Sequence, residues 1–264
     1  MSNPPPGVTS ACCEPPAVVG SREDYDVKGE FKKFSIFDKA YVTGPTDTKK
    51  AIIFIYDIFG YWKTTQQGAD ILSKQANALV VMPDFAHGKP YDLNRYDNPP
   101  EGVTPGAEVK AHFFEPKFFQ ERVDEVVAVA KDLRKDGYTF VGCLGLCWGG
   151  RVCLTAGSVQ PKVLDACASN HPAALAVEDG EKLQAPVALF PSKTDQIDVA
   201  ETIYKTIKAK PFGAVSEFHA YTDMHHGWSG AHAYLEKEDN YKQFGDVYGR
   251  LGTFFTNASE ATAA

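Results

Sequence analysis

The sequence predicts an α/β fold in which a mostly parallel central sheet is covered by helices on both faces. Two continuous apolar, β-branched runs, 51–57 and 78–84, each end in an aspartate, a pattern typical of buried parallel strands. Further apolar runs alternate with helical patterns along the chain, as such a sheet requires. With 264 residues, 44% of them hydrophobic, the chain can bury one large core. We predict a single domain over 25–264, preceded by an extended, proline-rich arm over 1–24.

The segments before residue 116 predict a sheet edge, a buried strand pair and a cap. Residues 31–37 and 39–44 are expected to form two short antiparallel strands joined by a turn at Asp38. A helix around 65–76 is expected between the two buried strands. Residues 84–115 are rich in Pro, Gly, Asn and Asp and lack clear periodicity, and a segment of this kind inside a domain is usually functional. We interpret 84–115, the cap segment, as a loop that lies over a site.

The second half of the chain continues the alternation. Apolar residues recur at helical spacing over 119–133, with charged residues on the other face, and Gly137 is expected to end that helix. Later apolar runs predict buried strands at 139–145, 165–170, 186–192 and 217–221. Helical patterns predict helices at 201–210 and 244–255. No glycine-rich nucleotide-binding fingerprint follows any of these strands, so the sequence gives a nucleotide site no support.

The stretch "GLCWG", residues 145–149, is the first pattern that points to chemistry. It matches the G-x-nucleophile-x-G elbow of α/β-hydrolases with Cys147 as the nucleophile, and a strand before and a helix after it are both expected. A strained turn of this kind needs small neighbours, which Gly145 and Gly149 provide. The adjoining helix N-terminus favours a thiolate and can hold an oxyanion. The alternative is a buried cysteine in a glycine-rich turn, since free cysteines are often core residues.

The chain order of acidic and histidine residues favours the nucleophile interpretation. In α/β-hydrolases the nucleophile is followed by an acid and then by a histidine, each on a loop after a successive strand. Asp195 follows the strand at 186–192, and His225 and His226 follow the strand at 217–221. Cys147, Asp195 and a histidine therefore occur in the required order, which predicts an α/β-hydrolase fold.

Four ordered motifs resemble the dienelactone hydrolase (carboxymethylenebutenolidase) family. "GLCWGG" is similar to the family's G-x-C-x-G-G nucleophile motif, "SKTDQID" to its acid loop and "HHGW" to its His-Gly-aromatic segment. "AIIFIYDIFGYW" resembles the family's early strand, which ends in an acid-Ile-Phe-Gly turn. The likeness extends from about Tyr25 to the C-terminus. It implies an α/β-hydrolase fold and a cofactor-independent hydrolase of ester or lactone bonds that works through an acyl-enzyme.

The resemblance also implies roles for individual residues. Cys147 corresponds to the nucleophile, Asp195 to the acid that orients the imidazole, and His226 to the base, with His225 as the alternative base. The backbone N–H groups of Ile58 and Trp148 are expected to form the oxyanion hole.

Two departures from the family pattern concern the substrate. The early-strand acid, a Glu proposed to pair with the thiol in the best-known members, is here the shorter Asp57, which can equally cap a turn. Two arginines that hold the substrate carboxylate in those members are absent, and the sequence has His87 near one position and Gly230 near the other. Because histidines are mostly neutral near pH 7, we expect neutral esters or lactones to be hydrolysed at least as well as anionic dienelactones.

Other aromatic and histidine residues are expected near the site. We predict that apolar parts of the substrate contact Trp148, Trp228 and the region of Phe85. His171 follows a strand end, where α/β folds build ligand pockets, although it can also be a hydrogen-bonded turn residue.

Composition limits the remaining possibilities. A net charge of −7 without runs of Lys and Arg disfavours nucleic acid as a partner, and no apolar stretch is long enough to span a membrane. Six cysteines, four of them in or beside apolar runs, are expected to be reduced, with no metal site at Cys12 and Cys13. These features predict a cytoplasmic monomer or homodimer with a small-molecule substrate and no cofactor.

Three alternative functions remain open from the sequence. The same residues would serve a thioesterase or a lactonase for larger natural products. A thiol redox sensor would use Cys147 with Cys143, or with Cys12 and Cys13, as the resolving partner. A binding protein that keeps the fold without activity is the third, and the ordered triad residues argue against it.

Overall fold

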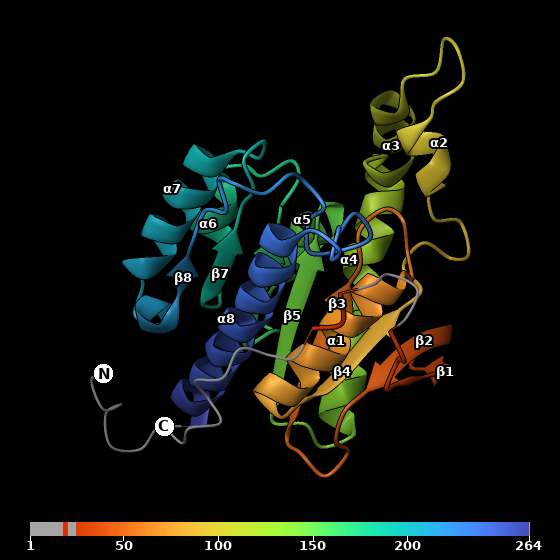
Figure 1. Ribbon diagram of the computed structural model, residues 1–264. Coiled ribbons are helices and arrows are strands. Elements are labelled where there is room, and N and C mark those ends of the chain that lie inside the picture. The colour runs from red at the N-terminus through yellow and green to blue at the C-terminus, as the bar shows by residue number, and fades with distance from the viewer. Residues whose placement is uncertain (1–17, 21–24, 264) are drawn as a thin grey trace, which may run out of the picture.

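A single sheet runs through the molecule, with strand order β1-β2-β4-β3-β5-β6-β7-β8 (Figure 1). The computed structural model describes residues 18–20 and 25–263. Within these residues β2 pairs antiparallel with β1 and with β4, and all pairings from β4 to β8 are parallel. The strands are β1 (Glu30–Phe34), β2 (Phe37–Thr43), β3 (Lys50–Ile55), β4 (Leu79–Pro83), β5 (Phe140–Leu146), β6 (Ala166–Asn170), β7 (Val187–Phe190) and β8 (Glu217–Phe218).

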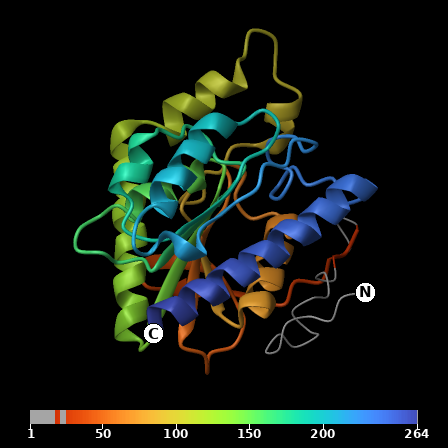
Figure 2. The same cartoon turned by 90° about the vertical axis from the view of Figure 1, so that its left-hand side faces the viewer.

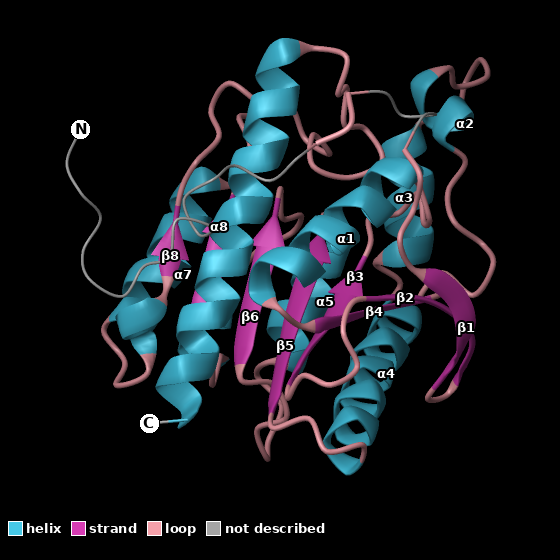
Figure 3. Cartoon of the chain, turned by 60° about the horizontal axis from the view of Figure 1, so that its bottom comes forward, coloured by secondary structure: helices cyan, strands magenta, loops and turns pink. Residues whose placement is uncertain are grey.

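Helices cover both faces of this sheet, as expected for a mostly parallel α/β fold (Figure 2). One face carries α1 (Lys63–Ala76) and α8 (Glu238–Ala263), which pack side by side, and the other carries α4 (Pro116–Lys135) and α5 (Trp148–Ala156) (Figure 3). The remaining helices are α2 (Leu93–Asp97), α3 (Pro105–Phe113), α6 (Glu178–Lys182), α7 (Ile197–Lys208) and the short 3₁₀ helix η2 (Gly213–Val215). The predicted fold class is therefore confirmed.

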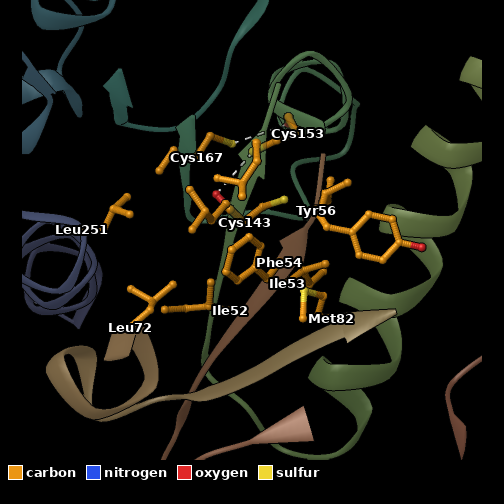
Figure 4. Packing of buried hydrophobic residues seen from close by; sticks show 14 of the residues in the cluster. Ile52, Ile53, Phe54, Tyr56, Leu72, Met82, Cys143, Cys153, Cys167 and Leu251 are labelled. Atoms are coloured by element: carbon orange, nitrogen blue, oxygen red, sulfur yellow. Dashed lines mark hydrogen bonds between the residues drawn. The ribbon is translucent and has the colours of Figure 1, made fainter. Parts of the chain in front are cut away.

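The core lies on both sides of the central strands, because β3 and β5 are buried on both faces. Figure 4 shows Ile52 of β3 close to Leu72 of α1 and Leu251 of α8. On the other face Cys143 of β5 lies near Cys153 of α5, whose Sγ is 3.3 Å from the Cys143 carbonyl oxygen. Successive residues of a strand point to opposite faces, so an uninterrupted apolar run can fill both halves of the core.

The predicted antiparallel edge is present, but its turn lies three residues earlier than expected. Ser35, with φ of 53°, makes the turn between β1 and β2, and Asp38 lies inside β2. Asp38 is instead a surface residue whose carboxylate is 2.8 Å from Lys33 Nζ. The last predicted strand is also shorter than expected, since only Glu217–Phe218 pairs with β7 before a single bridge joins Ser192 and Tyr221.

The cap segment forms two helices, α2 and α3, where the sequence predicted a loop. They lie at the end of the sheet toward which β5 points (Figure 1). Asp92 begins α2 by accepting a hydrogen bond from Arg95 N at 2.6 Å. Glu108 of α3 then joins the two helices, because its carboxylate accepts two hydrogen bonds from Arg95, of 3.0 and 2.7 Å, and one from the Tyr91 hydroxyl. Charge-assisted bidentate pairing of this kind fixes orientation as well as adding stability.

Most of the predicted N-terminal arm, 1–24, lies outside the described residues. The described part, 18–20, runs over α1 and α8. The backbone N–H of Val19 donates to Gln67 Oε1 at 2.6 Å, and the Tyr241 hydroxyl donates to the carbonyl of Val18 at 3.1 Å. Cys12 and Cys13 also lie outside the described residues.

Candidate active site

Cys147 occupies a strained turn between β5 and α5. Its φ of 57° and ψ of −121° lie outside the regions that residues other than glycine normally adopt. A Cβ atom added at Gly145 would lie 2.1 Å from the carbonyl oxygen of Gly149, and one added at Gly149 would lie 2.7 Å from that of Ile55. The turn is thus possible only with glycine at both positions, as the motif predicts. Cys147 is 9% exposed as a residue and lines a pocket.

Replacing Gly145 with alanine is therefore expected to destabilise the protein. The added methyl group would meet backbone rather than a movable side chain, and overpacking of this kind typically costs about 1–3 kcal/mol and sometimes more. Chemical denaturation would measure the change in free energy of unfolding. Gly106→Ala is the matched control, since a Cβ there has no described neighbour within 4 Å. Equal stabilities of the two variants would contradict this description of the turn.

Asp195 and His226 form a fixed pair beside Cys147. His226 Nδ1 lies 2.6 Å from Asp195 Oδ1, and Oδ2 of the same carboxylate accepts hydrogen bonds from Ser192 N at 2.6 Å and Ser192 Oγ at 2.8 Å. The Asp195 side chain is 3% exposed, whereas that of His226 is 35% exposed. With Nδ1 donating to the carboxylate, Nε2 is the ring nitrogen that can accept a proton. The neighbouring His225 instead places its Nε2 2.9 Å from the His232 carbonyl oxygen.

The charges around His226 favour its protonated form. Burial alone would lower the pKa of this imidazole, but the Cys147 thiolate and the hydrogen-bonded Asp195 carboxylate outweigh burial and raise the pKa well above its usual value. The imidazole of His226 therefore holds its proton more strongly than a free histidine does. A protonated imidazole next to a cysteine is one of the environments that favour the thiolate form.

A pocket of about 320 Å³ opens above Cys147 and His226. Its walls are mostly apolar or aromatic, and α2, α3 and the residue after α3, all from the cap segment, supply part of them. The lining residues are Asp57, Ile58, Phe59, Tyr96, Gly106, Val109, Phe114, Cys147, Ala173, His225, His226, Gly227, His232 and Tyr234.

The two predicted oxyanion-hole residues both lie close to Cys147, since Trp148 follows it in the chain and Ile58 lines the same pocket. Trp148 is the first residue of α5, where a backbone N–H has no acceptor within its own helix. Ile58 follows β3 and lines the pocket, and its carbonyl accepts a hydrogen bond of 2.8 Å from Tyr91 N. Of these two residues, only Ile58 is among those that line the pocket. The indole of Trp148 is fully buried, and its ring centroid lies 5.2 Å from that of Phe113.

The sequence left two roles open for Asp57, pairing with the Cys147 thiol and capping a turn. Its carboxylate lines the pocket, but Oδ1 accepts from Phe59 N and Oδ2 from Ala231 N, each at 2.9 Å. Burial raises the pKa of this carboxyl group above its usual value, although the two N–H donors oppose the shift. Asp57 thus ties the loop after β3 to the loop that carries His226, the turn-capping role.

Three residues that were predicted near the pocket lie elsewhere. His87, in the turn after β4, turns away from the site to place its Nε2 2.9 Å from Glu125 Oε1 of α4, and it lines a separate surface hollow. Trp228 is fully buried, and its ring centroid is 4.5 Å from that of Tyr221. Phe85 is likewise fully buried. These three residues are therefore not among those that line the described pocket, because the core and α4 hold their side chains away from it.

His171 packs against His226 without lining the pocket. It is fully buried, with a φ of 36°, and its ring centroid is 5.1 Å from that of His226 in an edge-on arrangement. Burial holds the pKa of its imidazole well below the usual value, so it is neutral near pH 7. It is not among the residues that line the pocket. Of the two roles that the sequence left open, pocket residue and turn residue, the structure shows neither directly, and its ring contact is with the predicted base.

The sequence did not identify the cap residues that complete the pocket, or His232. His232 Nε2 lies 3.0 Å from Asp97 Oδ1 at the end of α2, which links the cap to the loop of His226. Tyr96, Val109 and Phe114 come from a segment whose pattern gave no period. The Asp92 and Pro105 helix-start signals could have located α2 and α3.

The other cysteines of the described chain are core residues. Cys143, Cys153 and Cys167 have no exposed surface and lie together between β5, β6 and α5 (Figure 4). Burial raises the pKa of the Cys143 thiol, which disfavours its role as a resolving thiol for Cys147. Among the described residues there is no cluster of three or more His, Cys, Asp or Glu that could hold a metal ion. Over the same residues, no helix combines the length and apolar character of a membrane-spanning segment.

Comparisons with known proteins agree with the geometry. The chain is 28% identical over 256 residues to an uncharacterized AIM2 family protein of Schizosaccharomyces pombe, covering 94% of this chain and 98% of that protein. It is 31% identical over 153 residues to a carboxymethylenebutenolidase homolog of Rattus norvegicus, covering 56% and 57%. The fold superimposes on a dienelactone hydrolase from Anabaena variabilis with a TM-score of 0.56 at 13% identity, over 88% of this chain and 97% of that one. The model of the dienelactone hydrolase family matches residues 39–258, and the chain therefore belongs to this family of ester and lactone hydrolases.

Proposed function

We propose that this chain is a cysteine-dependent hydrolase of neutral esters or lactones that works through a Cys147–Asp195–His226 triad and an acyl-enzyme. The observation that carries the proposal is the arrangement at the pocket floor. A strained turn presents Cys147, and His226, held by Asp195 at 2.6 Å, faces it. The test is the loss of ester hydrolysis in Cys147→Ala, with Cys153→Ala as the control, as described in the Discussion.

The proposed acylation step uses Cys147 as the nucleophile and His226 as the proton donor. The thiolate of Cys147 attacks the carbonyl carbon, and the carbonyl π electrons move to oxygen, which accepts hydrogen bonds from the N–H groups of Ile58 and Trp148. Collapse of this intermediate expels the alcohol oxygen, which takes a proton from His226 Nε2. For a lactone the alcohol remains attached to the acyl group.

Deacylation reverses the proton transfer. His226, now neutral, removes a proton from water as the water attacks the thioester carbonyl. The second tetrahedral intermediate expels the Cys147 thiolate and releases the carboxylic acid. Asp195 holds the imidazole in the tautomer that both steps require and stabilises its charged form.

The charges near the pocket support a neutral substrate. Among the described residues that line it there is no Lys or Arg. Arg95 is engaged by Glu108 in the cap, and Arg151 is engaged by Asp179. Asp57 adds a buried carboxyl group to the wall, so a substrate carboxylate would lie near a like charge with no guanidinium partner.

We therefore predict that a neutral lactone is hydrolysed at least as efficiently at pH 7 as an analogue that carries a carboxylate. A charge-assisted hydrogen bond to a guanidinium contributes about 1.5–3 kcal/mol, and the described pocket offers none. The measurement is kcat/KM for both compounds at pH 7. A strong preference for the anionic compound at pH 7 would refute the neutral-substrate assignment.

The volume of the pocket distinguishes this proposal from hydrolysis of large natural-product lactones. At about 320 Å³ it lies at the lower end of the range for small-molecule sites, which is about 300–1,000 Å³. Compact esters, lactones and thioesters fit the same chemistry. Including a small thioester beside the oxygen esters in the substrate panel would separate the esterase from the thioesterase alternative.

A further inference from the structure

A second hollow lies directly behind one wall of the active-site pocket. It holds about 520 Å³ and is lined by Asp223, Met224, His225, Tyr234, Lys237, Asp239 and Asn240. His225 and Tyr234 line both this hollow and the active-site pocket. These two side chains, which we call the His225–Tyr234 wall, therefore separate the two spaces.

Contacts on both sides hold the wall in place. The two rings lie with their centroids 5.0 Å apart and their planes 35° from parallel. His225 Nε2 is 2.9 Å from the His232 carbonyl oxygen, and the backbone N–H of Tyr234 donates to Asn240 Oδ1 at 2.7 Å. Lys237 Nζ lies 4.6 Å from the Tyr234 ring centroid on the side of the second hollow. A wall braced in this way presents a fixed limit to the length of the pocket.

We propose that the His225–Tyr234 wall determines substrate length, and that Tyr234 is the main specificity residue. The inference rests on the proposed function and refines its substrate class to compact neutral esters and lactones. A longer acyl or alkyl chain would have to pass through the space that the Tyr234 ring occupies. Removing the ring would join the pocket of about 320 Å³ to the hollow of about 520 Å³ and give such a chain room.

The test compares Tyr234→Ala with the wild type on two series of substrates. One series lengthens the acyl group, from p-nitrophenyl acetate through hexanoate to decanoate, and the other lengthens the alcohol of alkyl acetates. The expected result is a rise of about tenfold or more in the ratio of kcat/KM for the longest to the shortest member of one series. The second hollow is lined mostly by polar side chains, so the expected gain is set at the lower end of the roughly 10–200-fold discrimination that one methylene group gives in an apolar pocket.

Matched variants separate the loss of the wall from other effects. Tyr234→Phe keeps the ring and should keep the wild-type length ratio. His225→Ala removes the other half of the wall without changing the Tyr234–Asn240 bond, and it should raise the same ratio if Tyr234→Ala fails to fold. An unchanged ratio in both series for the folded alanine variants would overturn the proposal.

The experiment distinguishes an error in the proposed role of the His225–Tyr234 wall from an error in the proposed function. If the wild type does not hydrolyse p-nitrophenyl acetate, or if Cys147→Ala hydrolyses it equally well, the proposed function is wrong. If hydrolysis requires Cys147 but the length ratio never changes, only the role of the wall is wrong.

Discussion

Cys147→Ala is expected to abolish ester hydrolysis and leave the fold intact. Alanine keeps the Cβ that the turn at φ of 57° already accommodates, so only the nucleophilic sulfur is lost. In serine proteases, loss of the nucleophile lowers kcat by about 10⁶-fold, and a loss of at least about 10⁴-fold is expected here. The measurement is kcat/KM for p-nitrophenyl acetate, with circular dichroism to verify folding.

Cys153→Ala provides the matched control for this experiment. Its thiol is fully buried in α5, with Sγ 3.3 Å from the Cys143 carbonyl oxygen, and it does not line the pocket. This variant should retain turnover and lose some stability because a cavity remains where the sulfur was. Wild-type turnover by Cys147→Ala would rule out Cys147 as the nucleophile.

Asp195→Asn is expected to produce the second-largest loss of activity. Ser192 N and Oγ both donate to Oδ2, so the amide oxygen of asparagine would take that position and its NH₂ group would face His226. Nδ1 would then have to accept a hydrogen bond, which moves the ring proton to Nε2, where it blocks proton removal from the thiol. The corresponding change in a serine protease costs about 10⁴-fold in kcat.

The pH dependence of the same variant gives a second measurement. The Asp195 carboxylate helps to raise the pKa of His226, so its removal should move this pKa downward and shift the pH–rate profile to lower pH. A thiolate beside the histidine reduces the loss relative to a serine enzyme, because the nucleophile depends less on the base. A decrease in kcat/KM of less than tenfold, with an unshifted profile, would show that Asp195 does not orient the base.

The strands, and the meeting of Asp195 with His226 at one edge of the sheet, could be predicted from the sequence because local patterns determine both. The runs at 51–57 and 78–84 have no polar interruption before their final aspartates, as expected of strands that are buried on both faces. The carboxyl ends of parallel strands meet at one edge of the sheet. Residues such as Asp195 and His226, which follow β7 and β8, are therefore brought together although 31 positions separate them.

The pocket walls could not be predicted in the same way, because they depend on tertiary partners. His87 follows β4 just as Asp57 follows β3, but Glu125 on a distant helix determines which way His87 turns. The helices of the cap are held by Glu108 and Arg95, a pair that no hydrophobic period reveals. Trp228 sits two residues beyond His226, yet it packs into the core against Tyr221.

The most direct test of the proposed mechanism is mass spectrometry of the protein after brief reaction with a panel of activated esters and lactones. Acid quenching during turnover should preserve a thioester, because its hydrolysis requires the neutral imidazole of His226. We expect the mass of the peptide that contains Cys147 to increase by the mass of the acyl group. We expect no such increase in Cys147→Ala. Rapid hydrolysis without an adduct on Cys147, or with an adduct on another residue, would contradict a cysteine acyl-enzyme.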